Sequence, residues 1–264
     1  MSELFRRRAS LRVGESVWDG LRLTFVVRRT LRKRPNLAQG IRVYGLDWRT
    51  VGSIMTPGAA VQLSAGYETT AEVVFSGQIT RAQQRREGAD QVTEITAEDG
   101  SDAWGSVTSR VLGGSVALRS LVETLAQDMG LTLTAESAAV LTGVARKSTV
   151  LRGYARDQLD VILRSAGYTW SIQDGALQVL REGAALATQA VVLGPQTGLV
   201  GDPKPLEKGR GWLVESLMQP KIKPGRTVLL KSERAEGAYR ATIVEHHGDT
   251  HSQQPWTTRV ELRP

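Results

Sequence analysis

The sequence predicts a mainly β protein with an α+β insertion, in which two small antiparallel β-barrel domains flank a small α/β domain. Short runs of alternating apolar and polar residues, bounded by Gly, Pro and Asp, recur near both ends of the chain. Helical spacing of apolar residues is confined to the middle. Glycine is abundant, at 27 of 264 residues, whereas aromatic residues make up only 5%. We expect domains at 1–105, 106–182 and 183–264, the last beginning with a connector.

The first domain is predicted from short strands. The residues that share one face of a strand at 21–29 are Leu21, Leu23, Phe25 and Val27. Pro35 should end the pairing of this segment, because proline cannot donate a hydrogen bond to a strand ladder. Further strands are predicted at 41–46, 61–67, 71–79 and 91–98. Such regular spacing is typical of a small barrel or sandwich.

The middle domain combines helices with a hairpin. Apolar residues at helical spacing predict helices at 117–129 and 154–166, each followed by a glycine that suits a helix C-terminus. Strands at 168–172 and 176–180 are joined through Asp174-Gly175, and an Asp-Gly pair between alternating strands is a strong hairpin signal. These elements predict a small α/β unit.

The last domain begins with a Gly-, Ala- and Pro-rich segment at 183–211, which predicts a connector with a long loop. Strands follow at 212–218 and 227–231. A final pair of strands should flank a polar turn at 248–250, because glycine permits positive φ and aspartate bonds to its own backbone. In the first strand of this pair, one face is expected to carry Tyr239, Ala241, Ile243 and Glu245.

Composition excludes several classes of protein. The chain contains no cysteine, which rules out disulfides, thiolate chemistry and cysteine-based zinc sites. A run of about 18 apolar residues is absent, so no transmembrane helix is expected. The first eight residues carry charges with no apolar segment behind them, and we expect no signal peptide.

The net charge of +7 comes from the N-terminal segment. Residues 1–34 hold ten Arg or Lys and three Asp or Glu, and the rest of the chain is neutral. The densest part of this segment comprises Arg28, Arg29, Arg32, Lys33 and Arg34. Such a run can bind phosphates or an acidic protein surface. It lacks interleaved aromatic residues for stacking bases, so we interpret it as an exposed protein interface or solvated loop.

Candidate catalytic and metal sites are weak. On a continuous strand His247, Asp249 and His251 would share a face that suits a metal, but the predicted turn at 248–250 would break that face. The chain has no Gly-x-Ser-x-Gly elbow and no phosphate-binding glycine pattern between a strand and a helix. We therefore expect no catalytic residue, no cofactor and no metal.

Several motifs near the end of the chain resemble those of one family. They are Ser-Leu-x-x-Pro-x-Ile-x-Pro-Gly ending at Gly225, Gly-x-Tyr at 237–239, the His-His-Gly-Asp-Thr run ending at Thr250, and Trp-x-Thr at 256–258. This pattern is similar to the C-terminus of baseplate hub proteins of tailed bacteriophages, the late-control/tail-hub family. The residues that carry the resemblance are Pro220, Pro224, Gly225, Gly237, Tyr239, His247, Gly248, Asp249, Thr250, Trp256 and Thr258.

The resemblance implies a structural virion protein of the tail baseplate, assembled in the host cytoplasm, and no enzyme. Such a hub is a homotrimer whose two related barrels per chain form a pseudo-six-fold ring, and it joins the six-fold tail tube to the three-fold central spike. The implied partners are the tail tube protein or tube initiator, the spike protein, other baseplate proteins and a tape-measure protein, with no membrane. Two alternatives remain: a peptidoglycan-binding or wall-degrading tail-tip protein that uses residues 106–182, and a nucleic-acid binder.

Overall fold

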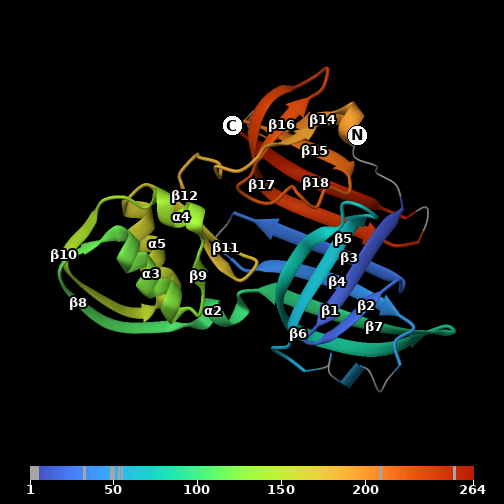
Figure 1. Ribbon diagram of the computed structural model, residues 1–264, viewed down its shortest axis with the longest axis horizontal. Coiled ribbons are helices and arrows are strands. Elements are labelled where there is room, and N and C mark those ends of the chain that lie inside the picture. The colour runs from blue at the N-terminus through green and yellow to red at the C-terminus, as the bar shows by residue number, and fades with distance from the viewer. Residues whose placement is uncertain are drawn as a thin grey trace. The chain divides into compact units, whose positions relative to one another are not determined.

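The computed structural model describes residues 6–31, 34–47, 51–52, 54, 56–207, 210–251 and 254–264, with the backbone alone at 144–148. The chain divides into two compact units (Figure 1). The first unit combines the N-terminal part of the chain up to Thr30, Asn36–Asp99 and Thr188–Pro264. The second unit is formed mainly by Gly100–Ala187.

The first unit is built on a 13-stranded, mainly antiparallel sheet. Its strands are β1 (Arg7–Val13), β2 (Ser16–Asp19), β3 (Leu23–Thr30), β4 (Asn36–Tyr44), β5 (Ala60–Tyr67), β6 (Glu72–Glu87), β7 (Asp90–Asp99), β13 (Val191–Leu193), β14 (Leu199–Pro205), β15 (Trp212–Leu217), β16 (Thr227–Lys231), β17 (Glu236–Asp249) and β18 (Trp256–Arg263). The strand order is β14-β15-β18-β17-β3-β4-β7-β6-β5-β1-β2, and β16 joins β13 to β17. The β17–β3 pairing therefore links the C-terminal strands to the N-terminal ones (Figure 1).

Two apolar clusters lie within this unit. One gathers buried residues of the strands β1 to β7, such as Leu11, Leu63 and Ile95, and also includes Trp256 from β18. The other gathers residues of β13 and of β15 to β18, such as Val244. Each cluster is filled by alternate residues of its strands, which accounts for the period-2 pattern in the sequence.

Most predicted strands of this unit are confirmed. Leu23, Phe25 and Val27 share the buried face of β3, as their alternation indicates. Strand β4 starts at Asn36, immediately after Pro35, because the proline lies before the ladder and the ladder needs no donor there. Strand β6 continues to Glu87, well beyond the apolar run that predicted it.

Two expectations for the C-terminal part are wrong. The segment 183–211 is not only a connector, since it contains β13, a 3₁₀ turn at Pro195–Thr197 and β14. The turn expected at 248–250 begins later, because β17 runs through Asp249 and pairs there with β3. Glycine and aspartate are accommodated in the strand by contacts from neighbouring elements, described below.

The second unit confirms the predicted helices and hairpin. Its elements are α2 (Ser101–Gly105), β8 (Val107–Ala117), α3 (Leu118–Asp128), β9 (Thr132–Leu133), α4 (Ala135–Val140), β10 (Val144–Tyr154), α5 (Ala155–Ser165), β11 (Tyr168–Gln173) and β12 (Ala176–Arg181). Asp174 and Gly175 both have positive φ between β11 and β12, as a two-residue hairpin turn requires. The ribbon formed by β8 and β10 escaped prediction, because its exposed outer face breaks the apolar alternation.

Within the described residues, no helix combines the length and apolarity that crossing a membrane would need.

Candidate assembly interface

The arginine run does not lie entirely on the surface. Arg28 projects from β3 and pairs with Glu245 on β17, at 3.4 Å between Nε and Oε1. Arg29 is 1% exposed and donates to the carbonyl oxygen of Val74 at 3.2 Å. The expectation of an exposed side chain is therefore wrong for Arg29, because strand alternation places it on the same face as Val27.

The remaining members of the run give less information. Arg34 is exposed. Arg32 and Lys33 lie outside the described residues. An interface role for the exposed part of the run stays a prediction.

The C-terminal motif residues converge on the junction between β17 and β3. Gly248 pairs with Phe25, and the ring of Phe25 lies where a side chain at 248 would be: a Cβ there would meet the ring at 2.2 Å. The same ring packs edge-on against Trp256, with centroids 5.8 Å apart. The Trp256 indole N–H donates to the carbonyl oxygen of Gly66 at 3.1 Å. Glycine at 248 and tryptophan at 256 thus form one packed corner.

Asp249 and Thr250 close the same junction through hydrogen bonds. Thr250 exchanges two bonds with Leu23: its N–H donates to the Leu23 carbonyl, and its hydroxyl accepts from the Leu23 N–H, both at 3.0 Å. The Asp249 carboxylate accepts from the His251 N–H at 2.8 Å. Arg7 donates to the carbonyl oxygens of Asp249 and His251 at 2.9 and 2.7 Å. The motif is therefore a clip that holds the C-terminal strands to the N-terminal ones.

His246 and Thr258 form a buried polar pair beside this clip. Both residues are 0% exposed, and Nδ1 of His246 lies 2.9 Å from the Thr258 hydroxyl. That hydroxyl also accepts from the Gln219 N–H at 2.9 Å, which fixes the chain after β15. Burial lowers the pKa of His246 to about 3, and the positive charges of Arg29 and Lys223 add to the shift. The imidazole is therefore neutral at neutral pH.

The other motif residues shape the turn before β16 and the start of β17. Pro224 and Gly225 are buried, and Gly225 has φ of 90°, a left-handed conformation that favours glycine. Gly237 also has positive φ, and a Cβ there would touch the Tyr239 ring at 3.3 Å. The Tyr239 hydroxyl accepts from the Trp212 indole at 3.1 Å.

A β-bulge decides which residues of β17 face inward. The register between β17 and β18 shifts between Ala241 and Ile243. After the shift, Val244 and His246 are fully buried, whereas Glu245 is partly exposed. The predicted face of Tyr239, Ala241, Ile243 and Glu245 is therefore wrong beyond the bulge, because one extra residue reverses the alternation.

The three histidines point to different surroundings. His246 is buried, His247 is partly exposed with its Nε2 3.7 Å from Glu245, and His251 is exposed. In the part of the chain that the structure describes, no group of three or more His, Asp or Glu side chains is placed to hold a metal ion.

An internal repeat relates the two ends of the sheet. The sequence Pro-Gly-x-x-Val-x-Leu occurs at 57–63 and again at 224–230. Both glycines have positive φ, 83° at Gly58 and 90° at Gly225. This repeat was not predicted from the sequence, although four identical residues within seven positions are visible there.

Hydrogen bonds show that the two copies are equivalent in structure. The Gly58 N–H donates to the Ile79 carbonyl at 2.8 Å, and the Gly225 N–H donates to the Ala241 carbonyl at the same distance. Ile79 lies in β6 and Ala241 in β17. Each of these strands has a β-bulge at the following residue. The register of β6 with β7 shifts directly after Ile79, and the register of β17 with β18 shifts directly after Ala241.

The bulge itself is repeated. In β6 the bulged residue is Thr80, whose hydroxyl donates to the Thr96 carbonyl at 3.2 Å. In β17 it is Thr242, whose hydroxyl donates to the Glu261 carbonyl at 3.1 Å. Both bulges contain a threonine whose hydroxyl makes the same kind of hydrogen bond. They therefore align β6 with β17 residue by residue, with Thr80 equivalent to Thr242.

Counting onward from the bulge gives a matched polar pair. Gln84 of β6 is equivalent to His246 of β17. The Gln84 amide donates to the Thr93 hydroxyl at 3.5 Å, and His246 contacts the hydroxyl of the equivalent residue Thr258. The strands β5, β6 and β7 therefore correspond to β16, β17 and β18.

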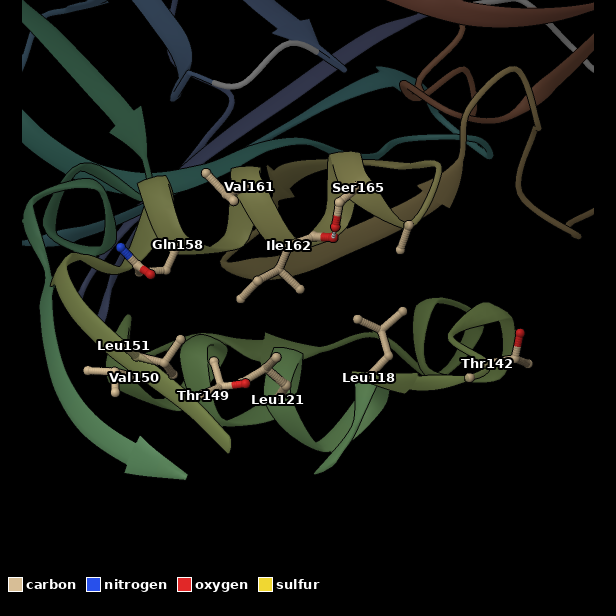
Figure 2. A pocket seen from close by; sticks show the side chains of 12 residues that line it. Leu118, Leu121, Thr142, Thr149, Val150, Leu151, Gln158, Val161, Ile162 and Ser165 are labelled. Atoms are coloured by element: carbon tan, nitrogen blue, oxygen red, sulfur yellow. Dashed lines mark hydrogen bonds between the residues drawn. The ribbon is translucent and has the colours of Figure 1, made fainter. Parts of the chain in front are cut away.

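The second unit contains a hollow of about 340 Å³ between α3, α5 and β10. Figure 2 shows Ile162 of α5 and Leu118 of α3 pointing toward one another across it, with Leu121 and Leu151 beside them. Among the described side chains that line it there is no aromatic ring and no carboxylate. Glycoside hydrolysis needs a pair of carboxylates, so this hollow does not provide that chemistry.

One family model and several solved structures are similar to this chain. The family model described as baseplate hub gp41 matches residues 31–251. No curated protein sequence matches the chain. Among solved structures, the 43 kDa tail protein of prophage MuSo2 from Shewanella oneidensis is similar at a TM-score of 0.69 and 10% identity, over 97% of this chain and 98% of that one.

Two further structures share the fold. The tail protein from Neisseria meningitidis MC58 has a TM-score of 0.69 and 11% identity, over 98% of this chain and 97% of that one. The E. coli c3393 protein, a type VI secretion component described as similar to the bacteriophage T4 tail proteins gp27 and gp5, has a TM-score of 0.63 and 11% identity, over 96% of this chain and 76% of that one. Because the family model spans most of the sequence, and the fold is that of phage tail proteins, this chain belongs to the baseplate hub gp41 family, whose members are components of the virion tail.

Proposed function

We propose that the protein is the structural hub of the baseplate, a homotrimeric ring of pseudo-six-fold symmetry that joins the six-fold tail tube to the three-fold central spike. In this proposal the two apolar clusters of the first unit are the cores of two related barrels. Three copies present six such barrels, which match the tube on one side and leave three-fold symmetry for the spike on the other. Closed rotational symmetry limits growth of the assembly.

The internal repeat is the observation that carries this proposal. A ring of three identical chains matches a six-fold partner only if each chain offers two equivalent surfaces. The paired bulges at Thr80 and Thr242, with equivalent hydroxyl bonds, support two such surfaces in one chain. The clip around Asp249 and Thr250 would hold these surfaces at a fixed angle.

We further propose that the protein is not an enzyme and needs no cofactor. Its partners would be the tail tube protein or tube initiator, the spike protein, other baseplate proteins and the tape-measure protein, brought together in the host cytoplasm. The exposed arginines, among them Arg28 and Arg34, would contact an acidic surface of one of these partners.

The mass of the purified protein in solution tests the ring. Light scattering at several concentrations should give three times 28.7 kDa. Negative-stain microscopy of the same sample should show rings with six peripheral densities. A strict monomer in solution that also fails to enter a complex with tube and spike proteins would contradict the proposal.

A further inference from the structure

The long strand β17 has one edge that receives two strands in succession. Its first part, up to Arg240, pairs with β16, and its part from Ile243 to Asp249 pairs with β3. The opposite edge pairs with β18 from Arg240 to Gly248. The segment of β17 beyond the bulge is thus held between β18 and β3.

The corresponding strand β6 lacks one of these neighbours. Its first part, up to Gln78, pairs with β5, and its other edge pairs with β7 as far as Glu87. Along Thr80–Glu87, the edge that corresponds to the β3 side of β17 pairs with no strand among the described residues. Among the described strands, none takes on β6 the place that β3 takes on β17.

The repeat also identifies the strand that fits this place on β6. One row of paired residues crosses β3, β4, β7 and β6 at Leu23, Val43, Thr93 and Gln84. The equivalent row crosses β14, β15, β18 and β17 at Leu199, Ser216, Thr258 and His246. Strand β14 is therefore the counterpart of β3. Among the described strands it stands at the end of the sheet and pairs with β15 alone, so it does not reach β6 of its own chain through this sheet.

We infer that β14 of one copy docks along Thr80–Glu87 of β6 in the next copy. This inference rests on the proposed homotrimer and names the surfaces that would meet in it. The contact is head to tail, as closure of a ring requires. Three junctions between copies would then alternate with the three β3–β17 junctions within copies.

The β3–β17 register gives the expected register between copies. Asp249 pairs with Thr24, so its counterpart Glu87 should oppose Val200 of the neighbour. Both residues are exposed, and Val200 is a large apolar side chain at 44% exposure.

Charge and backbone chemistry suit the same contact. The Thr80–Glu87 segment of β6 carries the exposed Arg81, Arg85 and Arg86, and β14 carries the exposed Asp202, which pairs with Arg234 of its own chain at 3.1 Å. Pro203 and Pro205 remove two N–H donors from β14, so hydrogen bonds there would run mainly from β6 N–H groups to β14 carbonyls. Prolines in an edge strand also discourage pairing with unrelated strands.

Cysteine cross-linking tests the inference directly, because the chain contains no cysteine of its own. Two full-length single variants, Glu87→Cys and Val200→Cys, are mixed, allowed to assemble and oxidised. A disulfide requires Cα atoms within about 7 Å, so a cross-linked dimer forms only if the two edges of different copies meet. We expect this dimer on non-reducing gels, and its loss on reduction.

The matched control replaces Val200→Cys with Val192→Cys, an exposed valine on β13 at 40% exposure. This pair should give no cross-link above the background of each single variant. Light scattering of the wild type is run in parallel. A trimer without selective cross-linking would overturn the β14–β6 contact and leave the trimer standing. Absence of both trimer and cross-link, in a protein that also fails to enter a complex with the tube and spike proteins, would reject the two proposals together.

A second pair of variants tests the charge complementarity of the two segments. Arg85→Glu and Asp202→Lys should each shift the trimer toward monomer on dilution, and the double variant should recover part of the loss. Equal behaviour of the single and double variants would contradict charge complementarity at the β14–β6 contact. Circular dichroism establishes that all three remain folded.

Discussion

Gly248 shows how one missing side chain shapes the junction between the two ends of the chain. Its φ lies outside the left-handed region, so the backbone alone does not demand glycine. The demand comes from Phe25, whose ring occupies the space of a Cβ. Phe25 in turn packs on Trp256, so the three positions are constrained as a group.

We predict that Gly248→Ala lowers the free energy of unfolding by about 1–3 kcal/mol, the usual cost of adding a carbon atom to a packed site. Urea unfolding measures the change. Gly113→Ala is the control, because a Cβ there meets no atom within 4 Å and should change stability by less than about 0.5 kcal/mol. Equal effects of the two substitutions would contradict the packing argument.

His246 should make the protein sensitive to acid. Its folded pKa of about 3 lies below the ordinary value of 6.5, so between these two pH values the unfolded chain binds a proton that the folded chain does not. The free energy of unfolding should therefore fall as pH decreases from 6.5 toward 3, by at most about 1.4 kcal/mol per pH unit from this residue.

The variant His246→Gln tests this dependence, because glutamine is the residue at the equivalent position 84. We expect a shallower fall of stability with decreasing pH than in the wild type, measured by urea unfolding at successive pH values. His251→Gln, at an exposed position, is the control for loss of an imidazole. An unchanged slope in His246→Gln would show that His246 does not dominate the acid response.

At the scale of elements, the alternation of apolar and polar residues predicted the bulged strands β6 and β17 only in part. The extra residue in β17 reverses inside and outside after Ala241, so a face assigned from Tyr239 onward fails at Glu245. In β6, the strand continues through a charged segment to Glu87 because β7 supplies hydrogen bonds, although apolar alternation has ended. Backbone pairing with a partner strand is invisible to a pattern that only records side-chain hydrophobicity.

Helices α3 and α5 were predictable because their apolar faces are continuous. Leu159 of α5 is fully buried, whereas Val161 of the same helix is 64% exposed. We predict that Leu159→Ala destabilises the protein by about 2–5 kcal/mol through loss of burial and a cavity. Val161→Ala should cost less than about 0.5 kcal/mol. Thermal unfolding of both variants measures the difference, and similar losses would show that the second unit packs differently.

At the scale of the whole molecule, the excess positive charge is available to a partner only in part. The Arg29 side chain is buried, whereas Arg28 and Arg34 are exposed. We predict that Arg28→Ala combined with Arg34→Ala weakens co-assembly with an acidic baseplate partner. Folding stability should change by less than about 1 kcal/mol, as is usual for surface ion pairs.

Co-sedimentation with the tube and spike proteins, at two salt concentrations, measures this effect. Arg119→Ala with Arg152→Ala, which removes two exposed arginines from the second unit, is the matched control. Equal weakening by both double variants would indicate a general charge effect and would contradict a specific role for the N-terminal run.

The sequence by itself determined the mainly β class, the positions of most strands, the two main helices, the Asp174-Gly175 hairpin and the family resemblance. Each of these depends on neighbours along the chain: periodicity, turn residues and short motifs. The Pro-Gly-x-x-Val-x-Leu repeat was also present in the sequence, and it needed the hydrogen bonds of Gly58 and Gly225 to show its meaning.

Only the tertiary structure decided that β17 pairs with β3 and that Arg29 and His246 are buried. It also decided that β6 and β14 each have an edge with no partner among the described strands. These features depend on which distant strands share an edge. Hydrogen bonding between strands is carried by backbone groups that every residue possesses, so the side-chain pattern does not encode the partner. Burial of a polar side chain follows from that choice of partner, and it becomes visible only when the sheet is assembled.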